Sequence, residues 1–245
     1  MRLTRPRILR VLLLGSLGLG IAWGLAAPMT THQGVNFQVS TLDIPSYVKA
    51  IDFLHRHYQY QLIADRITHG LKSDQERVLA VFDWTRRNIR RTPKDWPIMD
   101  DHILHIIIRG HGMSDQLADV FTTLSTYAGI PAFWMFVRGL PEGSPGLVLS
   151  FAKVDGAWRV FDVARGVVFS DSRGQLIDVE TLLAAPALAD SAARPTPPGL
   201  EYAPYVEHLR PFSVPDPLRA EQQMPWPRLF FEIRHALRLK PVEAS

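Results

Sequence analysis

The sequence predicts an α+β protein in which helices pack on an antiparallel β-sheet. Apolar residues recur at helical spacing through much of the first half, whereas the second half contains short apolar runs separated by turn residues. One of these turns is Asp155-Gly156, a pair that strongly favours a β-hairpin. With 245 residues, 47% of them hydrophobic, the chain can bury one core of ~150 residues together with appendages.

The composition excludes several classes of function. The sequence contains no cysteine, which rules out disulfides, thiolate metal sites, a lipoprotein anchor and a cysteine nucleophile. Lysine and arginine number 27 against 24 aspartates and glutamates, and arginines at the N-terminus account for this small excess. The charge therefore gives no reason to expect nucleic acid as a partner.

Residues 1–28 have the pattern of a targeting segment. Arginines occupy positions 2, 5, 7 and 10, and an uncharged, largely apolar run follows from Val11 to Ala27. This asymmetry is typical of a secretory signal peptide or a signal anchor, and the run is at the short limit of the ~17–25 residues that span a membrane. Because Pro28 would directly follow a cleavage point, we expect an uncleaved anchor in a bacterial inner membrane, with the bulk of the chain periplasmic or extracytoplasmic. Residues 29–44 are expected to form a tether.

Two helices are predicted next, over about residues 45–67 and 73–90. The second begins with Ser73, which can cap the helix while Glu76, three residues later, completes a capping box. Trp84 lies near the middle of this helix, and the arginines at its end suit the negative end of the helix dipole. These helices open a domain that we expect to extend over residues 45–183.

Histidines and aspartates crowd the segment that precedes the central helix. His102 and His105 are three residues apart and would share one face of a helix over residues 101–109, which is one feature of a metal site. Isoleucine and leucine residues are interleaved with them, so we favour a short buried segment whose histidines bond locally or line a cleft. We therefore expect no metal and no cofactor; a metal site at Asp101, His102, His105 and His111 is the weaker alternative.

The central helix is expected from Ser114 to Ala128. Ser114 is a good N-cap residue, and Gly129 followed by Pro131 ends the helix. Free N–H groups at a helix start stabilise an anion, so Ser114 occupies the position at which a reactive thiolate would be most useful. The spacing predicts a buried face made of Leu117, Val120, Phe121, Leu124 and Ala128.

The second half predicts an antiparallel sheet followed by two appendages. Strands are expected at about residues 132–138, 147–154, 158–162 and 166–169. Residues 184–225 are rich in alanine and proline and predict an extended surface strap.

Residues 226–245 contain an amphipathic helix with basic residues opposite its apolar stripe. We expect the stripe to dock on the chain's own domain, and a membrane or a partner protein is the alternative. The stripe consists of Trp226, Leu229, Phe230, Ile233 and Leu237.

The segment around Ser114 resembles the transglutaminase-like superfamily, whose fold is of the papain type. The similarity consists of a Gly-x pair before Ser114 and a helix that ends in Gly-Ile-Pro-Ala at residues 129–132. It continues in VDGAWRVFDVARG, at residues 154–166, which is similar to the family's hairpin and the strand that ends at a catalytic aspartate. The resemblance extends over about residues 75–168, and Trp84 matches a tryptophan on the family's preceding helix.

The resemblance implies that Ser114, Leu147 and Asp162 occupy the positions of the family's catalytic cysteine, histidine and aspartate. Leu147 is assigned by counting fifteen residues back from Asp162, and no histidine occurs between Gly112 and Glu207. A serine hydroxyl is much harder to ionise than a thiol with a pKa of ~8.5, and a helix dipole contributes at most ~2 kcal/mol. We therefore expect a catalytically degenerate domain, a pseudoenzyme, without peptidase, amidase or acyltransferase activity.

The expected function is binding of a peptide, a glycan or an assembly partner in the former active-site cleft. The residues expected to line this cleft are His105, His111, Trp84 and Gln116. The alternative is an atypical hydrolase or acyltransferase in which His111 or His105, on the upstream loop, acts as the base for Ser114.

Overall fold

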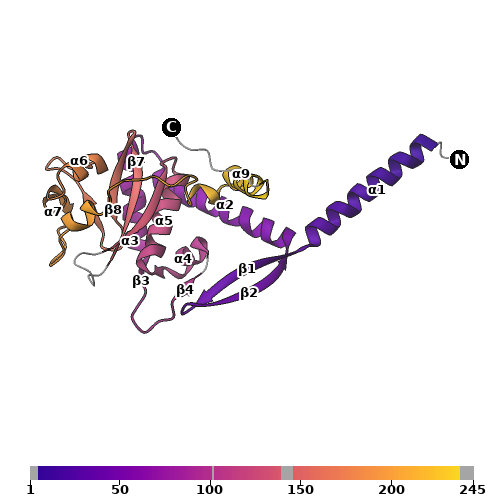
Figure 1. Ribbon diagram of the computed structural model, residues 1–245, viewed down its shortest axis with the longest axis horizontal. Helices are drawn as coiled ribbons and strands as arrows, with labels where there is room; N and C mark the ends of the chain where they lie inside the picture. Colours follow the sequence, from indigo (N-terminus) through magenta and orange to yellow (C-terminus); the bar gives the residue numbers. More distant parts are fainter. Residues whose placement is uncertain (1–4, 101, 139–145, 238–245) are drawn as a thin grey trace.

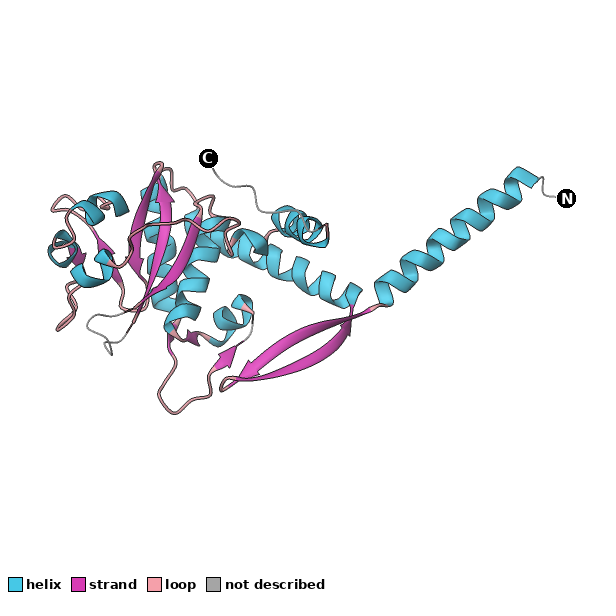
Figure 2. Cartoon of the chain, viewed as in Figure 1, coloured by secondary structure: helices cyan, strands magenta, loops and turns pink. Residues whose placement is uncertain are grey.

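Helices and one main antiparallel sheet form the body of the protein, which confirms the α+β class (Figure 1). The computed structural model describes residues 5–100, 102–138 and 146–237. Figure 2 shows a long helix projecting from one end of the molecule, next to a two-stranded hairpin. The N-terminal elements are α1 (Arg5–Ala26), β1 (Pro28–Val35), β2 (Gln38–Pro45), α2 (Ser46–Thr68) and α3 (Asp74–Asn88).

The capping box predicted from the sequence is present at the start of α3. Ser73 Oγ accepts a hydrogen bond from the N–H of Glu76 at 3.1 Å, and the Glu76 carboxylate accepts one from the N–H of Ser73 at 3.0 Å. This bond from Ser73 stabilises the carboxylate and lowers the pKa of Glu76. Two otherwise free backbone donors are thereby satisfied, which explains why the helix begins at this point.

The central helix is α5 (Ser114–Tyr127), and short elements lead into it. They are β3 (Arg90–Arg91), β4 (Met99–Asp100), α4 (Ile103–Arg109) and β5 (His111–Gly112). Gly110 ends α4 in the left-handed conformation, with φ of 71°, which costs glycine little. β5 then pairs with β3 in parallel, so the chain reaches α5 already held against the end of α3.

The main sheet has the strand order β10-β9-β8-β7-β6, and its neighbours are antiparallel. Asp155 and Gly156 join β7 to β8 with φ values of 49° and 82°, the positive values that a tight hairpin turn requires. The predicted hairpin is therefore confirmed. The strands are β6 (Ala132–Val137), β7 (Leu147–Val154), β8 (Ala157–Asp162), β9 (Val167–Phe169) and β10 (Ala193–Arg194).

The two faces of this sheet contribute to two separate hydrophobic clusters. One cluster contains the inward face of α5 together with Ala132, Ala152 and Phe161 from the strands. The other contains alternate residues of the same strands, including Leu147, and packs against the segment that follows the sheet. This segment includes α6 (Val179–Ala184), α7 (Leu188–Ala192) and α8 (Ala203–Glu207).

The prediction of an extended surface strap over residues 184–225 is wrong. The segment forms α7, α8, the short helix η1 (Glu221–Gln223) and strand β10, and it covers the sheet face opposite α5. The many alanines and prolines of this segment suggested an exposed strap. A few large side chains are nevertheless buried there, because burial depends on individual contacts and not on average composition. They are Tyr202, Tyr205, Val206, Leu209 and Leu218.

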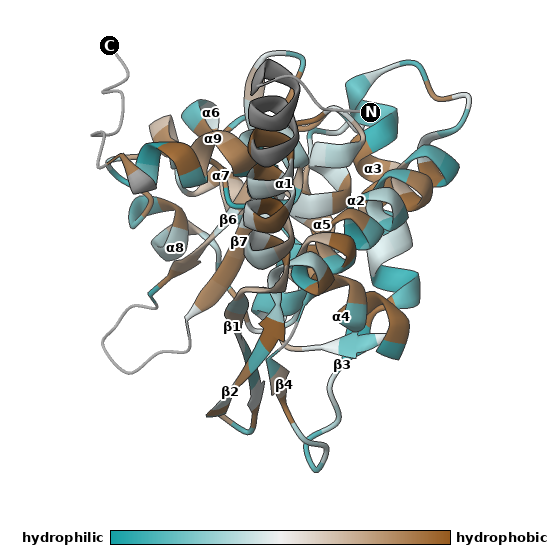
Figure 3. Ribbon diagram, turned by 90° about the vertical axis from the view of Figure 1, so that its right-hand side faces the viewer, coloured by the Kyte–Doolittle hydropathy of each residue, from teal (hydrophilic) through white to brown (hydrophobic). Residues whose placement is uncertain are grey.

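The prediction of a tether over residues 29–44 is also wrong, because these residues form most of the β1-β2 hairpin. Asn36 and Phe37 make its two-residue turn with φ values of 49° and 65°. Figure 3 shows this hairpin extending away from the body, with α1 in front. Ser46 Oγ donates to the carbonyl of Gly24 at 2.7 Å, which joins the end of α1 to the start of α2. Within the described residues, the structure contains no helix both long and apolar enough to cross a membrane.

The C-terminal helix α9 (Pro225–Ala236) is amphipathic, as predicted, but its apolar stripe does not dock on the domain. It follows the short helix η1 (Glu221–Gln223). Trp226 and Phe230 on the stripe are 69% and 60% exposed. The expected docking is therefore wrong, because a different side of α9 contacts the body.

The burial of α5 predicts a large cost for truncating Phe121. Its ring is fully buried, with centroids 6.0 Å from Phe82 and 5.0 Å from Phe161. We expect Phe121→Ala to lower the free energy of unfolding by ~3–5 kcal/mol in urea denaturation. The matched control is Phe136→Ala, at a position 60% exposed, with an expected cost below ~1 kcal/mol. Equal costs at the two positions would contradict the core placement of Phe121.

Candidate functional site

The candidate site is the N-terminus of α5, where Ser114 is the first helical residue. Met113, in extended conformation, is the N-cap, so the helix begins one residue earlier than it would with Ser114 as the N-cap. The Ser114 side chain is half-buried, and its hydroxyl makes no hydrogen bond to any of the described residues. The Ser114 hydroxyl therefore has no hydrogen-bond partner among the described residues at the start of the helix.

Gln116 holds the backbone around this helix start. Its Oε1 accepts hydrogen bonds from the N–H of Met113 and from an Arg109 guanidinium nitrogen, both at 3.0 Å, and its amide donates to the carbonyl of Met99. Arg109 also donates to the carbonyl of His111 at 2.8 Å. With its side chain buried and saturated in this way, Gln116 supports the site from beneath, where we had expected it to line the cleft.

The start of α5 lies near the level at which β6 ends and β7 begins. Asp119, further along α5, accepts a 2.7 Å hydrogen bond from Trp134 Nε1 on β6, which fixes the helix against the strand. Ser114 precedes Asp119 by five residues, a rise of ~7.5 Å, which corresponds to about two residues of a strand running the other way. Phe136, and Val148 paired with it on β7, are therefore level with Ser114 on the face towards α5.

Leu147 and Asp162 lie at this end of the sheet, but on the opposite face. Leu147 is 1% exposed and packs with Leu149, Phe151 and the C-terminal segment, away from α5. Successive strand residues point to opposite faces, so a difference of one position between Leu147 and Val148 decides which of them is on the α5 side of the sheet. The structure therefore does not bring Ser114 and Leu147 together.

Asp162 is fully buried, and its carboxylate accepts three hydrogen bonds from two residues. Its carboxylate accepts hydrogen bonds from the Tyr202 hydroxyl at 2.9 Å, the Arg165 guanidinium at 3.1 Å and the Arg165 N–H at 3.0 Å. Burial and the neighbouring Asp162 raise the pKa of Tyr202, which keeps this hydroxyl a donor. Asp162 thus joins the β8-β9 turn to the C-terminal segment, and it is not available to orient a base next to Ser114.

The histidines expected near Ser114 are placed apart from it. His111 Nδ1 lies 3.2 Å from Thr92 Oγ1, and its ring packs edge-on against Trp96 with centroids 5.0 Å apart. His105 is exposed on α4, with its ring 5.9 Å from that of His102. Among the residues that the structure describes, none of these rings hydrogen-bonds to Ser114, and no group of three potential metal ligands converges. Trp84 packs, partly buried, against the core beneath α5.

A buried carboxylate beside the site was missed by the sequence analysis. Asp119 is 8% exposed; besides Trp134 it pairs with Arg219 at 3.0 Å, and the Arg219 guanidinium lies 5.8 Å from the Trp134 ring centroid. Burial raises the pKa of Asp119. The only sequence signal was an acid inside an otherwise buried helix, because its partner Arg219 lies 100 residues further along the chain. The cluster ties the C-terminal segment to the edge formed by α5 and β6.

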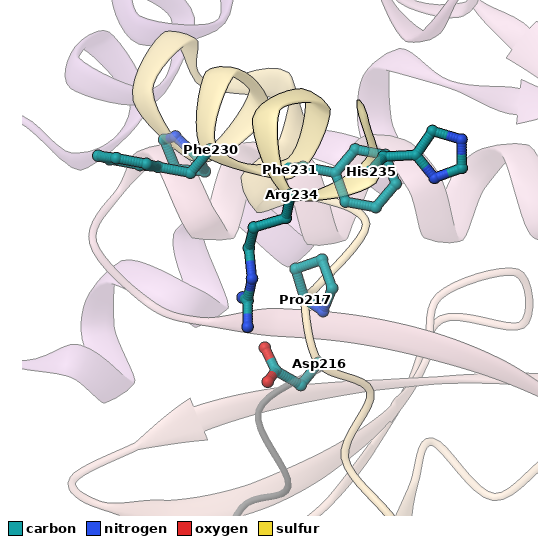
Figure 4. Close-up of a pocket in the computed structure, with 7 residues that line it drawn as sticks. Asp216, Pro217, Phe230, Phe231, Arg234 and His235 are labelled. Atoms are coloured by element: carbon teal, nitrogen blue, oxygen red, sulfur yellow. The ribbon is translucent and has the colours of Figure 1, made fainter. Parts of the chain in front are cut away.

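The clearest cavity in the described structure lies elsewhere, beneath α9. It has a volume of about 390 Å³ and is lined by Asp216 and Pro217 on one side and by residues of α9, including Phe231 and Arg234, on the other (Figure 4). None of the residues assigned to the candidate site from the sequence lines it.

Comparison with protein families matches residues 61–163 to the transglutaminase-like superfamily. No curated protein sequence matches the chain. Among solved structures, a cysteine protease candidate from Cytophaga hutchinsonii is 20% identical over 53% of this chain and 45% of its own, with a TM-score of 0.39. A protease candidate from Parabacteroides distasonis is 14% identical over 62% and 40%, with a TM-score of 0.33, and a TGase is 12% identical over 61% and 47%, with a TM-score of 0.34. The chain spans less than half of the length of each of these proteins.

The placement of Val148 can be tested with an engineered thiol. Because the chain has no cysteine, Ser114→Cys introduces a single one, at a helix N-terminus. We expect Ser114→Cys with Val148→His to show a thiol pKa below the ordinary ~8.5, measured from the pH dependence of alkylation, because an imidazolium then faces the thiolate. The matched control, Ser114→Cys with Leu147→His, should titrate like Ser114→Cys alone. A lower pKa in this control than in the Val148 variant would contradict the facing assigned here; circular dichroism checks the fold of each variant.

Proposed function

Because residues 61–163 form a domain of the transglutaminase-like superfamily, we propose that the chain is a catalytically degenerate member that binds a partner at the former active-site cleft. The partner is a peptide, a glycan or a component of an assembly. The domain is held at the outer surface of an inner membrane by the N-terminal segment, with no requirement for a metal or another cofactor. Recognition would take place at the start of α5, around Ser114.

One observation carries this proposal: the sheet face level with Ser114 presents apolar side chains where a base would be needed. Phe136 and Val148 lie on the sheet face towards α5 at this level, and Ser150 and Phe161 are the next paired residues of that face on β7 and β8. A serine hydroxyl requires a neighbouring base to become a nucleophile. An apolar surface beside free helix N–H groups is suited instead to holding a ligand that has both apolar and acceptor groups.

The atypical hydrolase is the second candidate, and the structure favours it less. His111 on the upstream loop is the nearest histidine in the sequence, but its Nδ1 contacts Thr92 and its ring packs on Trp96. The ring would have to leave both neighbours to reach Ser114. Asp162, which orients the base in the family's arrangement, is held by Tyr202 and Arg165 on the far face of the sheet.

Two substitutions at Ser114 separate binding from catalysis. We expect Ser114→Ala to complement a strain that lacks the gene, because the hydroxyl has no base to activate it. We expect Ser114→Trp to fail, because an indole at this half-exposed position blocks the mouth of the cleft. Thermal unfolding of both proteins serves as the folding control. Loss of function in Ser114→Ala would favour the hydrolase, and full function in both variants would contradict any role for this site.

Membrane anchoring is proposed from the N-terminal sequence, in which four arginines precede the apolar part of α1. Arginines of this kind stay on the cytoplasmic side, which would place the domain outside. A reporter that is active only after export should therefore be active when fused after Ser245. Detergent, and not high salt, should be needed to release the protein from membranes. An active cytoplasmic reporter at the same position would contradict this topology.

A further inference from the structure

The apolar stripe of α9 remains exposed although the helix itself is attached to the domain. Trp226, Phe230 and Leu237 are 69%, 60% and 63% exposed, and Leu229 and Ile233 are 45% and 44% exposed. A contiguous apolar surface of this kind marks an interaction site in a soluble domain. We therefore expect the stripe to contact a surface that the described residues do not provide.

A different side of α9 holds it to the domain. Phe230 of the stripe and His235 also line the cavity against Asp216 and Pro217, but most of its α9 wall consists of Pro227, Phe231 and Arg234; Figure 4 shows the Arg234 side chain pointing towards Asp216. At about 100° per residue, these three positions lie roughly a quarter-turn from the centre of the stripe. The helix therefore rests on the body along one edge and presents its apolar stripe outwards.

The attachment of α9 fixes this orientation through the preceding helix η1. The Tyr127 hydroxyl at the end of α5 donates to the carbonyl of Gln223 at 2.7 Å, and His57 Nδ1 lies 2.8 Å from the same hydroxyl. Burial raises the pKa of Tyr127, so the hydroxyl keeps its proton and remains a donor. Leu218 and Ala220 are buried just before η1. The helix that carries the exposed stripe is thus attached to the core of the domain through η1.

The charges around the stripe indicate the chemistry of its occupant. Residues 225–240 contain four basic residues and one acidic residue, Glu232, which pairs with Arg228 at 2.5 Å. In sequence this segment therefore has a net charge of 4 − 1 = +3, and an amphipathic segment that is apolar and net basic fits a surface that is apolar within and phosphate-bearing outside. Trp226 at one end of the helix has the amphipathic ring that prefers such an interface. Figure 1 shows α9 at the end of the domain from which α1 projects, far from α6 and α7.

We propose that α9 lies in the interface of an anionic lipid membrane, with its stripe inserted at the boundary between headgroups and acyl chains. Together with α1 it would give the domain a second membrane contact and so set its orientation above the bilayer. The cooperation with α1 rests on the proposed anchoring, whereas lipid binding by α9 depends only on α9.

The test uses the full chain with one environment-sensitive fluorophore, since the absence of native cysteine makes any introduced thiol unique. The probe is attached at Phe230→Cys on the stripe, and the matched control carries it at Glu232→Cys on another side of the same helix. Both proteins are reconstituted with vesicles of phosphatidylcholine alone, or with phosphatidylglycerol added, and with spin-labelled acyl chains as quenchers. A third protein, labelled at Leu19→Cys, reports separately whether α1 enters the bilayer.

We expect lipid quenching and a blue shift at Phe230, stronger with phosphatidylglycerol, and little change at Glu232. In 1 M salt the preference for anionic vesicles should fall by roughly half or more, because the Debye length shortens from about 10 Å to about 3 Å. Equal quenching at both positions, or none at Phe230 while Leu19 is quenched, would overturn the proposal and leave the anchoring intact. A blue shift at Phe230 without lipid that grows with protein concentration would identify a second copy as the occupant and would also overturn it. Quenching at Phe230 without quenching at Leu19 would support the α9 proposal and refute the anchor.

Discussion

The burial of α5 is the constraint on which the rest of this structure depends. Eleven of its 14 residues are buried, including one carboxylate and several hydroxyls, because α2, α3, α4 and the sheet surround it. Thr122 and Thr126 donate to carbonyls four residues earlier, which allows these side chains to be polar and buried at the same time. The helix therefore cannot move without disturbing both the helical layer and the sheet. Ser114 at its first turn is correspondingly well fixed.

The sequence predicted those elements whose boundaries are set by neighbouring residues. It failed for the segment whose fold depends on contacts between residues far apart in the chain. Ser73 and Glu76 specify the start of α3 within four residues, and Asp155-Gly156 specifies the hairpin, so both predictions were correct. We predicted that the C-terminal segment is extended because its alanines and prolines outnumber its large side chains. Its folding depends on Tyr202 meeting Asp162 and on Arg219 meeting Asp119, contacts that join residues 40 and 100 positions apart. No local pattern contains this information.

At the candidate site, the sequence likewise did not show which of two adjacent strand residues is on the α5 side of the sheet. Counting along the chain assigns the family's histidine position to Leu147, the first residue of β7. In a strand, however, a shift of one residue reverses the face, and register is set by the pairing of β7 with β6 and β8. Phe161 contacts the α5 cluster and its neighbour Asp162 contacts the other, so a correct strand assignment can still give a wrong set of facing residues. The register places Val148, and not Leu147, on the sheet face that packs against α5.

The same register keeps the Asp162 carboxylate on the sheet face opposite α5, where its contacts are structural. A catalytic aspartate must leave an oxygen free to hold an imidazole, whereas all the polar contacts of Asp162 stabilise the fold. A buried carboxylate that loses its partners costs several kcal/mol, so Tyr202 and Arg165 make this residue necessary for stability whatever happens at Ser114. Asp162 therefore gives no evidence of retained activity. The proposed binding site therefore depends on the serine at the helix start and on the apolar residues of the sheet face towards α5.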